Sequence, residues 1–232
     1  MRRPSFTLIE LLCVIAVIAV LLSLLFPGIV QAIRRSKMAV CVSNFRQMGI
    51  GAHVFGADNN GDMPWAAPNK PGSGFGFMGT EAIWHADFGW FGHGQLWEKG
   101  YITGPKVFFC PTAGKFTYDS DWGWDASHRV TSNWIASSYG WNGMADYVSG
   151  SFDGRRLNVS KDPGRTPMAA DMFYPINYIP NIPPNHPNGF VVLRLDGSAQ
   201  LVKFDPLTLI SRIPDQVTYP KMATFGWQGE FK

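Results

Sequence analysis

The sequence predicts an α+β fold, in which one long amino-terminal helix packs on a small antiparallel sheet and a long loop-rich, Trp-rich insertion separates the two. Three observations predict this fold. Residues 11–33 carry no charge, and residues 38–55 place apolar side chains at helical spacing. Near the carboxyl end, two short apolar runs flank an Asp-Gly dipeptide that favours a tight hairpin. At 232 residues, the chain can hold one domain of moderate size with an appended element.

Composition and charge argue against two classes of protein. With 46% hydrophobic and 16% charged residues, the chain can bury a core, which a fully disordered chain cannot. The formal net charge is +3, and the excess comes from Arg2, Arg3, Arg34, Arg35 and Lys37, which flank the uncharged run. A nucleic-acid-binding domain concentrates Lys and Arg on its folded part. We therefore expect no nucleic-acid partner.

The uncharged run predicts a transmembrane helix over residues 6–33. Its 23 uncharged residues rise about 35 Å as a helix, enough to cross the hydrocarbon core of a bilayer. The alternatives are a buried core helix and a secretory signal peptide, whose apolar region is shorter and ends at a small-x-small cleavage site. Glu10 lies at the edge of the run, where an ionisable side chain needs a partner. The run contains no Lys or Arg, so a positive charge on another chain would have to supply it.

Helical periodicity continues past the basic residues, over residues 34–57. Apolar side chains recur every three or four residues on a single stripe, and polar side chains fall elsewhere. A segment rich in turn residues, from Asp58 to Pro64, ends the helix. We predict one continuous helix, half in a membrane and half packed on a soluble domain; two helices joined near the basic residues are the alternative. The stripe consists of Met38, Cys41, Phe45, Met48, Ala52 and Phe55.

The rest of the chain, residues 58–232, is interpreted as an extracytoplasmic globular domain. Residues 64–158 are predicted as the loop-rich insertion, with one short helix over residues 94–99. The last two predicted strands form a hairpin, with Asp196 and Gly197 in its turn. Strands are predicted at residues 106–110, 166–172, 190–195 and 199–204.

The amino terminus resembles the signature of type IV pilins and type II secretion pseudopilins. Residues 4–12 read Pro-Ser-Phe-Thr-Leu-Ile-Glu-Leu-Leu, and in that signature a short basic leader precedes a phenylalanine, Thr-Leu-Ile-Glu and an apolar helix. The resemblance implies a pilin-like fold, a prepilin leader at residues 1–5, cleavage between Ser5 and Phe6, and methylation of the new Phe6 amine. It also implies that Glu10 pairs with the terminal amine of a neighbouring subunit. One departure is Ser5, where the family usually has glycine.

The positive-inside rule does not set the orientation, because basic residues lie on both sides of the run. The resemblance implies a single-pass protein of the bacterial inner membrane with a cytoplasmic amino terminus. The globular domain would then be periplasmic or part of an extracellular filament. The implied partners are a prepilin peptidase and other pseudopilin subunits, in a homo- or hetero-polymer.

A wider resemblance covers the globular part. Its short motifs follow the order found in a bacterial group of pseudopilin-like proteins, whose carboxy-terminal H-X9-DG module is named after a histidine, nine residues and Asp-Gly. In this chain the module is His186, Asp196 and Gly197, within residues 186–204. The group is associated with prepilin processing and type II secretion-like assemblies, and the resemblance implies no enzymatic activity. The other matching motifs are residues 41–49, 57–64, 109–111 and 138–142.

His186 and Asp196 would form a catalytic dyad only if they met in space. With Asp196 and Gly197 in the hairpin turn, ten extended residues place His186 about 30 Å from Asp196. We therefore assign Asp196 to the turn and His186 to a hydrogen-bonded anchor at the start of the strand. Because the motifs supply no nucleophile, base and orienting group together, we predict no catalytic residues.

Metal binding has one candidate segment. Asp58, Asn60 and Asp62 place oxygen ligands at alternate positions, as calcium loops do, but no bidentate glutamate follows them. Turn and helix-stop chemistry is the preferred interpretation, calcium binding is the alternative, and no other cofactor is predicted. The five histidines show no zinc-site spacing.

The three cysteines leave two alternatives open. Cys13 lies in the apolar run, where we expect a reduced packing residue. Cys41 and Cys110 would both lie outside the cytoplasm, where disulfides persist. A Cys41–Cys110 disulfide is one interpretation, and two buried free thiols are the other.

These observations predict a non-enzymatic, membrane-anchored pseudopilin, a structural subunit of a type II secretion or type IV pilus-like assembly. The alternative is a minor or tip pseudopilin whose Trp-rich domain binds polysaccharide or secreted cargo. Eight of the nine tryptophans precede residue 142. Exposed tryptophans stack on sugars or fill interfaces, whereas buried ones build a core, and we prefer the core interpretation.

Overall fold

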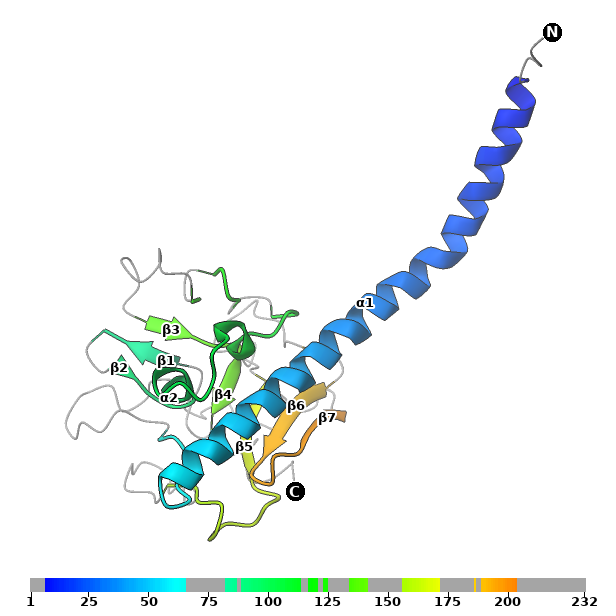
Figure 1. The fold of residues 1–232 in the computed structure, drawn as a ribbon. Helices are drawn as coiled ribbons and strands as arrows, with labels where there is room; N and C mark the ends of the chain where they lie inside the picture. Colours follow the sequence, from blue (N-terminus) through cyan, green and yellow to red (C-terminus); the bar gives the residue numbers. More distant parts are fainter. Residues whose placement is uncertain are drawn as a thin grey trace, which may run out of the picture. The chain divides into compact units, whose positions relative to one another are not determined.

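The computed structural model shows a long amino-terminal helix followed by short strands and helices (Figure 1). The chain divides into two compact units, Met1–Ala39 and Val40–Lys232, and each is described by itself. The structure describes residues 7–65, 82–86, 89–113, 117–120, 123–124, 134–141, 156–171, 186 and 189–203.

Helix α1 runs from Leu8 to Asp58 without a break and includes Pro27. This confirms the prediction of one continuous helix. Beyond its last turn the backbone enters the left-handed region at Asn60, with φ of 56°, and at Gly61, with φ of 86°. The Gly61 amide donates to the Gly56 carbonyl over 2.7 Å, which satisfies a helix-end acceptor in the manner of a C-cap.

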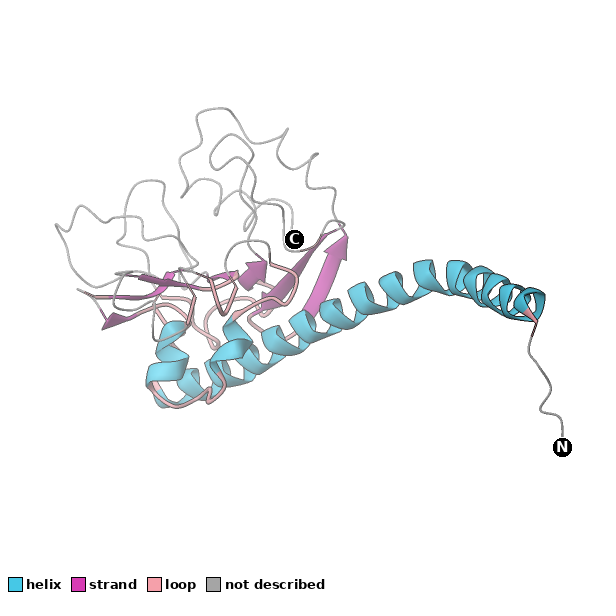
Figure 2. Cartoon of the chain, turned by 90° about the horizontal axis from the view of Figure 1, so that it is seen from above, coloured by secondary structure: helices cyan, strands magenta, loops and turns pink. Residues whose placement is uncertain are grey.

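The strands form two antiparallel sheets, which Figure 2 shows in magenta. In both sheets the strands are only two to six residues long. The larger sheet has the order β4 (Tyr139–Trp141), β5 (Pro167–Asp171), β6 (Gly189–Arg194) and β7 (Ala199–Lys203). The smaller sheet has the order β2 (Gly89–Trp90), β1 (Ala82–His85) and β3 (Trp134–Ala136).

The predicted carboxy-terminal hairpin is confirmed as β6 and β7, with Leu193 paired to Ala199. The connection closes with two backbone bonds of 2.9 Å, one from the Arg194 amide to the Ser198 carbonyl and one from the Gly197 amide to the Arg194 carbonyl. Gly197 has φ of 81°. This is a three-residue loop with glycine at the left-handed position, a common hairpin turn.

Within the second unit, α1 buries the predicted apolar stripe from Cys41 to Phe55. The Phe45 ring lies 4.4 Å from the Tyr139 ring of β4, measured between centroids. Gly49 permits close packing on the hairpin, because a Cβ at that position would lie 3.0 Å from Cδ1 of Leu193. The two views agree that this part of α1 runs alongside β6 (Figures 1 and 2). The core of the second unit therefore includes this face of α1 and the larger sheet.

The predictions for the insertion need two corrections. Residues 106–110 were expected as a strand, but Pro105–Phe108 form the 3-10 helix η1. Pro105 at the first helical position fixes φ in the helical range and favours this turn. Residues 64–158 were expected as mostly loop, yet they contain β1 to β4. These strands are too short to show an alternating pattern in the sequence.

Two other predicted elements are confirmed. The strand expected over residues 166–172 is β5, and the helix expected over residues 94–99 is α2 (Gly94–Glu98). The overall arrangement, a long apolar helix followed by small antiparallel sheets, is the predicted α+β class.

Candidate functional site

The first turn of α1 holds Glu10 in a capping box with Thr7. Oε2 of Glu10 accepts hydrogen bonds from the Thr7 amide at 2.9 Å and from the Thr7 hydroxyl at 2.8 Å. The Glu10 amide donates in return to Oγ1 of Thr7 at 3.3 Å. Thr and Glu three residues apart satisfy free amides at a helix start in this way. Within one chain, Thr7 is therefore the hydrogen-bond partner of Glu10, while the negative charge of Glu10 has no cation beside it in these contacts.

The amino-terminal half of α1 exposes apolar side chains all around its axis. This helix is long and apolar enough to cross a membrane, and none of its most apolar stretch is buried. The hydroxyl of Ser23, a polar group inside this stretch, donates to the Val20 carbonyl at 2.7 Å. A core helix of a soluble protein would bury one face. The exposed apolar surface supports membrane anchoring. The predicted cleavage residues Ser5 and Phe6 lie outside the described residues.

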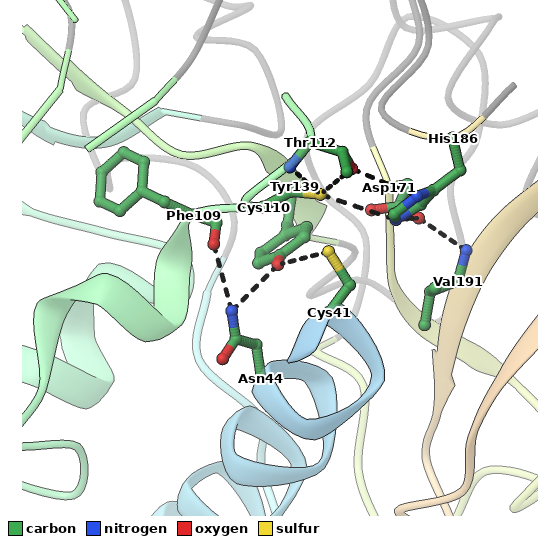
Figure 3. A network of polar contacts seen from close by, with 9 residues as sticks. All are labelled: Cys41, Asn44, Phe109, Cys110, Thr112, Tyr139, Asp171, His186 and Val191. Atoms are coloured by element: carbon green, nitrogen blue, oxygen red, sulfur yellow. Dashed lines mark hydrogen bonds and ion pairs between the residues drawn. The ribbon is translucent and has the colours of Figure 1, made fainter. Parts of the chain in front are cut away.

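A second group of functional side chains lies inside the second unit, where Cys41, Cys110, Asp171 and His186 meet (Figure 3). Their ligand atoms all lie within 4.8 Å of one another, and all four residues are buried. Four separate segments supply them: α1, the loop after η1, the end of β5 and the residue that precedes β6 by three positions. The group combines two thiols, a carboxylate and an imidazole, which are the side-chain types that bind metal ions.

The contacts of His186 define the geometry of this group. Its Nε2 lies 3.6 Å from Sγ of Cys110 and 3.4 Å from Oδ2 of Asp171. Its Nδ1 lies 3.2 Å from the hydroxyl of Thr112. The same nitrogen of His186 therefore faces both the thiol and the carboxylate, and the other nitrogen is held by Thr112.

Neighbouring groups hold the other three side chains in place. The Val191 amide donates to Oδ2 of Asp171 at 2.7 Å. The Tyr139 hydroxyl donates to Sγ of Cys41 at 3.5 Å, and Asn44 donates to that hydroxyl oxygen at 3.3 Å. Figure 3 shows two adjacent sets of contacts, one around Tyr139 and Cys41 and one that joins Cys110 through His186 and Asp171 to Val191.

The electrostatics favour charge separation between Cys110 and His186. Burial raises the pKa of the Cys110 thiol, but its contacts with Cys41, His186 and Thr112 outweigh burial and lower that pKa overall. The pKa of Cys41 is raised, mainly by its hydrogen bond to Cys110 and by burial. Burial lowers the pKa of His186, but Cys110 and Asp171 outweigh burial and raise it overall. These contacts therefore shift the Cys110–His186 pair towards a thiolate and an imidazolium.

The structure places the H-X9-DG residues in two different environments. Asp196 lies in the hairpin turn, where its Oδ1 accepts from the Ser198 amide at 2.8 Å. The pKa of Asp196 is lowered, first by the Ser198 side chain and then by this amide and the nearby charge of Arg194. His186 contacts Cys110, Asp171 and Thr112 instead. The length of the hairpin correctly predicted that His186 does not contact Asp196. It did not predict any of the residues that His186 contacts.

The calcium candidates are engaged in contacts that end α1. Oδ2 of Asp58 accepts from the Tyr101 hydroxyl at 2.7 Å, and Oδ1 of Asp62 accepts from Asn158 at 2.7 Å. Asn158 also donates to the Asn60 carbonyl at 3.1 Å. These contacts support the turn interpretation, and calcium binding stays a prediction.

Cys41 and Cys110, the predicted disulfide partners, lie in the same group as free thiols, and Cys13 is also free and exposed. The disulfide stays a prediction. Asp171 was missed altogether, because no spacing motif connects it with cysteines 61 and 130 residues away. The signal that could have identified the group is that Cys41 lies on the buried stripe while His186 precedes a core strand.

Six of the seven described tryptophans pack with other aromatic side chains, and Trp65 lies under the Arg156 guanidinium. Trp124 lies 5.1 Å from Trp90 and 4.8 Å from Trp97, measured between ring centroids. Trp141 is fully buried, and its indole donates to the Pro64 carbonyl at 3.0 Å. Trp124 and Trp141 are buried, which supports the core interpretation for these two, whereas the other described tryptophans are half-buried. Trp122 and Trp227 lie outside the described residues.

Comparison with known proteins identifies one region. Residues 1–26 match the family model of the prokaryotic N-terminal methylation motif. No curated protein and no solved structure matches the chain. The matched residues include Glu10 with its capping box and the first part of the exposed apolar helix. The amino terminus of this chain therefore carries a prepilin-type N-terminal methylation motif.

Proposed function

We propose that the chain is a membrane-anchored pseudopilin, a non-enzymatic structural subunit of a type II secretion or type IV pilus-like assembly. The observation that carries this proposal is the methylation motif at residues 1–26, which overlaps the first part of α1, a helix whose most apolar stretch is entirely unburied. A prepilin peptidase removes residues 1–5, cutting between Ser5 and Phe6, and Phe6 becomes the methylated amino terminus. The helices of neighbouring subunits then pack together in the membrane and in the filament.

Glu10 is the proposed assembly residue. Its carboxylate accepts two hydrogen bonds from Thr7, which orient it but do not neutralise it. In apolar surroundings an uncompensated carboxylate is costly. The positive terminal amine of a neighbouring Phe6 offsets that cost, so assembly is favoured when the two groups meet.

Substitution of Glu10 tests this role, and the structure permits a sharp design. Glu10→Gln keeps a residue that can complete the capping box but removes the negative charge, whereas Glu10→Ala removes both. We expect both variants to insert in the membrane and both to lose filament incorporation at least tenfold, measured by immunoblotting of sheared filaments. The matched control is Glu98→Gln, at an exposed glutamate in the last turn of α2, and we expect it to assemble normally. Wild-type incorporation of Glu10→Gln would contradict the charge-pairing role.

Mass spectrometry of the amino terminus tests processing separately. In membranes that contain a prepilin peptidase, we expect the chain to lack residues 1–5 and to carry one methyl group on Phe6. Removal of Arg2 and Arg3 would lower the formal charge from +3 to about +1. An intact, unmethylated Met1 in assembled protein would overturn the proposal.

A further inference from the structure

We propose that Cys41, Cys110, Asp171 and His186 form a tetrahedral Zn²⁺ site, which links α1 to the larger sheet of the second unit. The proposal goes beyond the role in assembly, since the site contains no residue of the methylation motif. It rests on the convergence of four ligand atoms of the types that bind zinc, all within 4.8 Å of one another and all buried (Figure 3).

Two of the six separations between ligand atoms match the edges of a tetrahedron around zinc, and the others are no longer than 4.8 Å. With usual Zn–S, Zn–N and Zn–O bond lengths, the edges are about 3.6 Å between sulfur and nitrogen and about 3.3 Å between nitrogen and oxygen. The corresponding distances here are 3.6 Å from Sγ of Cys110 to Nε2 of His186, and 3.4 Å from that nitrogen to Oδ2 of Asp171. A zinc ion can therefore be accommodated with small side-chain adjustments.

The orientation of His186 favours a metal site over a cysteine nucleophile. In a Cys-His-Asp catalytic arrangement, the carboxylate holds one imidazole nitrogen while the other faces the thiol. Here Nε2 faces both Cys110 and Asp171, and Nδ1 contacts the Thr112 hydroxyl. In addition, both cysteines are at most 2% exposed, so a substrate would not reach them. Four ligands that converge on one point are the arrangement of a closed, structural zinc site.

A second layer of hydrogen bonds orients the ligands, as is usual around zinc. Thr112 contacts Nδ1 of His186 and its amide donates to Sγ of Cys110 at 3.4 Å. The Val191 amide donates to Asp171 at 2.7 Å, and the Tyr139 hydroxyl donates to Cys41 at 3.5 Å. Each proposed ligand therefore has a neighbour that fixes its direction.

Charge also favours a cation in this group. Asp171 is 3% exposed, and a buried carboxylate needs compensation. Without a metal, His186 lies 3.4 Å from this carboxylate, and a bound cation takes over its compensation when His186 is neutral. When zinc binds, each thiol that carries a proton releases it to solvent, and a protonated His186 likewise releases its Nε2 proton and binds as neutral imidazole. Two thiolates and one carboxylate then offset the two positive charges of the ion and leave one negative charge, which the surrounding donors stabilise.

Zinc titration of the purified full-length chain in detergent tests the proposal. After chelation and reduction, competition with a chromophoric chelator should give one Zn²⁺ per chain for the wild type. We expect Cys110→Ser and His186→Gln to bind at least a hundredfold more weakly. The control Cys13→Ser removes an exposed cysteine outside the group and should bind like the wild type. If the wild-type chain binds zinc no more tightly than Cys110→Ser, the proposal is overturned.

Two further measurements test the zinc site without removing any of its four proposed ligands. Thr112→Val should weaken zinc binding about 10- to 100-fold, as loss of an outer-shell partner does, whereas Thr112→Ser keeps the hydroxyl and should bind normally. Co²⁺ bound in place of zinc should show thiolate-to-cobalt charge transfer and the intense visible bands of tetrahedral cobalt. Absence of those bands, or a Cys41–Cys110 disulfide that persists in chain purified with zinc and without reductant, would overturn the proposal. Loss of zinc binding and loss of filament assembly are separate results, because Glu10 is not part of the site.

Discussion

His93 is the clearest example of a side chain whose protonation is set by burial. It is fully buried between Phe108 and Trp141, with ring centroids 5.5 and 5.6 Å away. The Ser137 hydroxyl donates to the Tyr139 carbonyl at 2.6 Å, so Nε2 of His93 must donate to that hydroxyl oxygen, 2.7 Å away. Among the described residues, Nδ1 has no hydrogen-bond partner. Burial lowers the pKa of His93 to about 3, and the imidazole is neutral in the folded chain.

The lowered pKa of His93 predicts a loss of stability in acid. An exposed histidine in the unfolded chain takes up its proton below about pH 6.5, while His93 in the folded chain does so near 3. The contribution of neutral, buried His93 to the free energy of unfolding is therefore fully present above about pH 6.5, and it is lost as the pH falls from about 6.5 towards 3. Between pH 7 and pH 4.5, the fall in unfolding free energy should be about 2–3 kcal/mol smaller for His93→Gln than for the wild type. Denaturant titrations at the two pH values check this, and equal falls would contradict it.

At the scale of elements, close backbone contacts decide where helices can lie. Helix α2 begins at Gly94, where an added Cβ would collide with the carbonyl oxygen of Ile83 in β1. Gly104, before η1, has an ordinary φ of −105°, and a Cβ there would meet nothing within 4 Å. Each glycine lies at the start of a short helix, but only Gly94 is packed tightly against another element. The sequence does not show this difference, which depends on the positions of β1 and α2.

The two glycines form a matched pair for mutation. Gly94→Ala should lower the free energy of unfolding by about 1–3 kcal/mol, because the new methyl group forces α2 away from β1. Gly104→Ala should change it by less than about 1 kcal/mol, with stabilisation the expected direction, since alanine restricts the unfolded chain. Denaturant unfolding followed by tryptophan fluorescence measures both. Similar losses for the two variants would show that the packing of α2 on β1 does not limit stability.

At the scale of the whole molecule, α1 has two different surfaces. Its first part exposes apolar side chains all around, whereas the part in the second unit buries one stripe on the sheet. Val20 and Val54 are both exposed, at 59% and 48%, and they lie in these two parts. If the first part is a membrane anchor, the same substitution should impair membrane insertion at Val20 but not at Val54.

Arginine at each valine tests the anchor. Val20→Arg places a charge near the centre of the apolar segment and should disfavour insertion by about 2.5–3.5 kcal/mol. Val54→Arg places it on a solvated helix face and should leave insertion unchanged. Alkaline extraction of membranes measures the fraction of chain that stays in the pellet. Equal retention of both variants would argue against a transmembrane role for the first part of α1.

The sequence by itself determined the elements whose signals are local. The uncharged run and the stripe from Cys41 to Phe55 predicted α1, and the Asp-Gly dipeptide predicted the β6–β7 hairpin. Both could be predicted because helical periodicity and turn preference depend on residues that are close in sequence. The same local character explains why residues 1–26 alone match a known motif.

The tertiary structure decided what depends on distant residues. The short strands β1 to β4 and the 3-10 turn at Pro105 escaped prediction, because pairing partners and packing, not local pattern, select their conformation. The group of Cys41, Cys110, Asp171 and His186 is the fullest case. Its members are up to 145 positions apart, and no spacing connects them. Only the packing of α1 on the larger sheet brings two sulfurs, a carboxylate and an imidazole to one buried point.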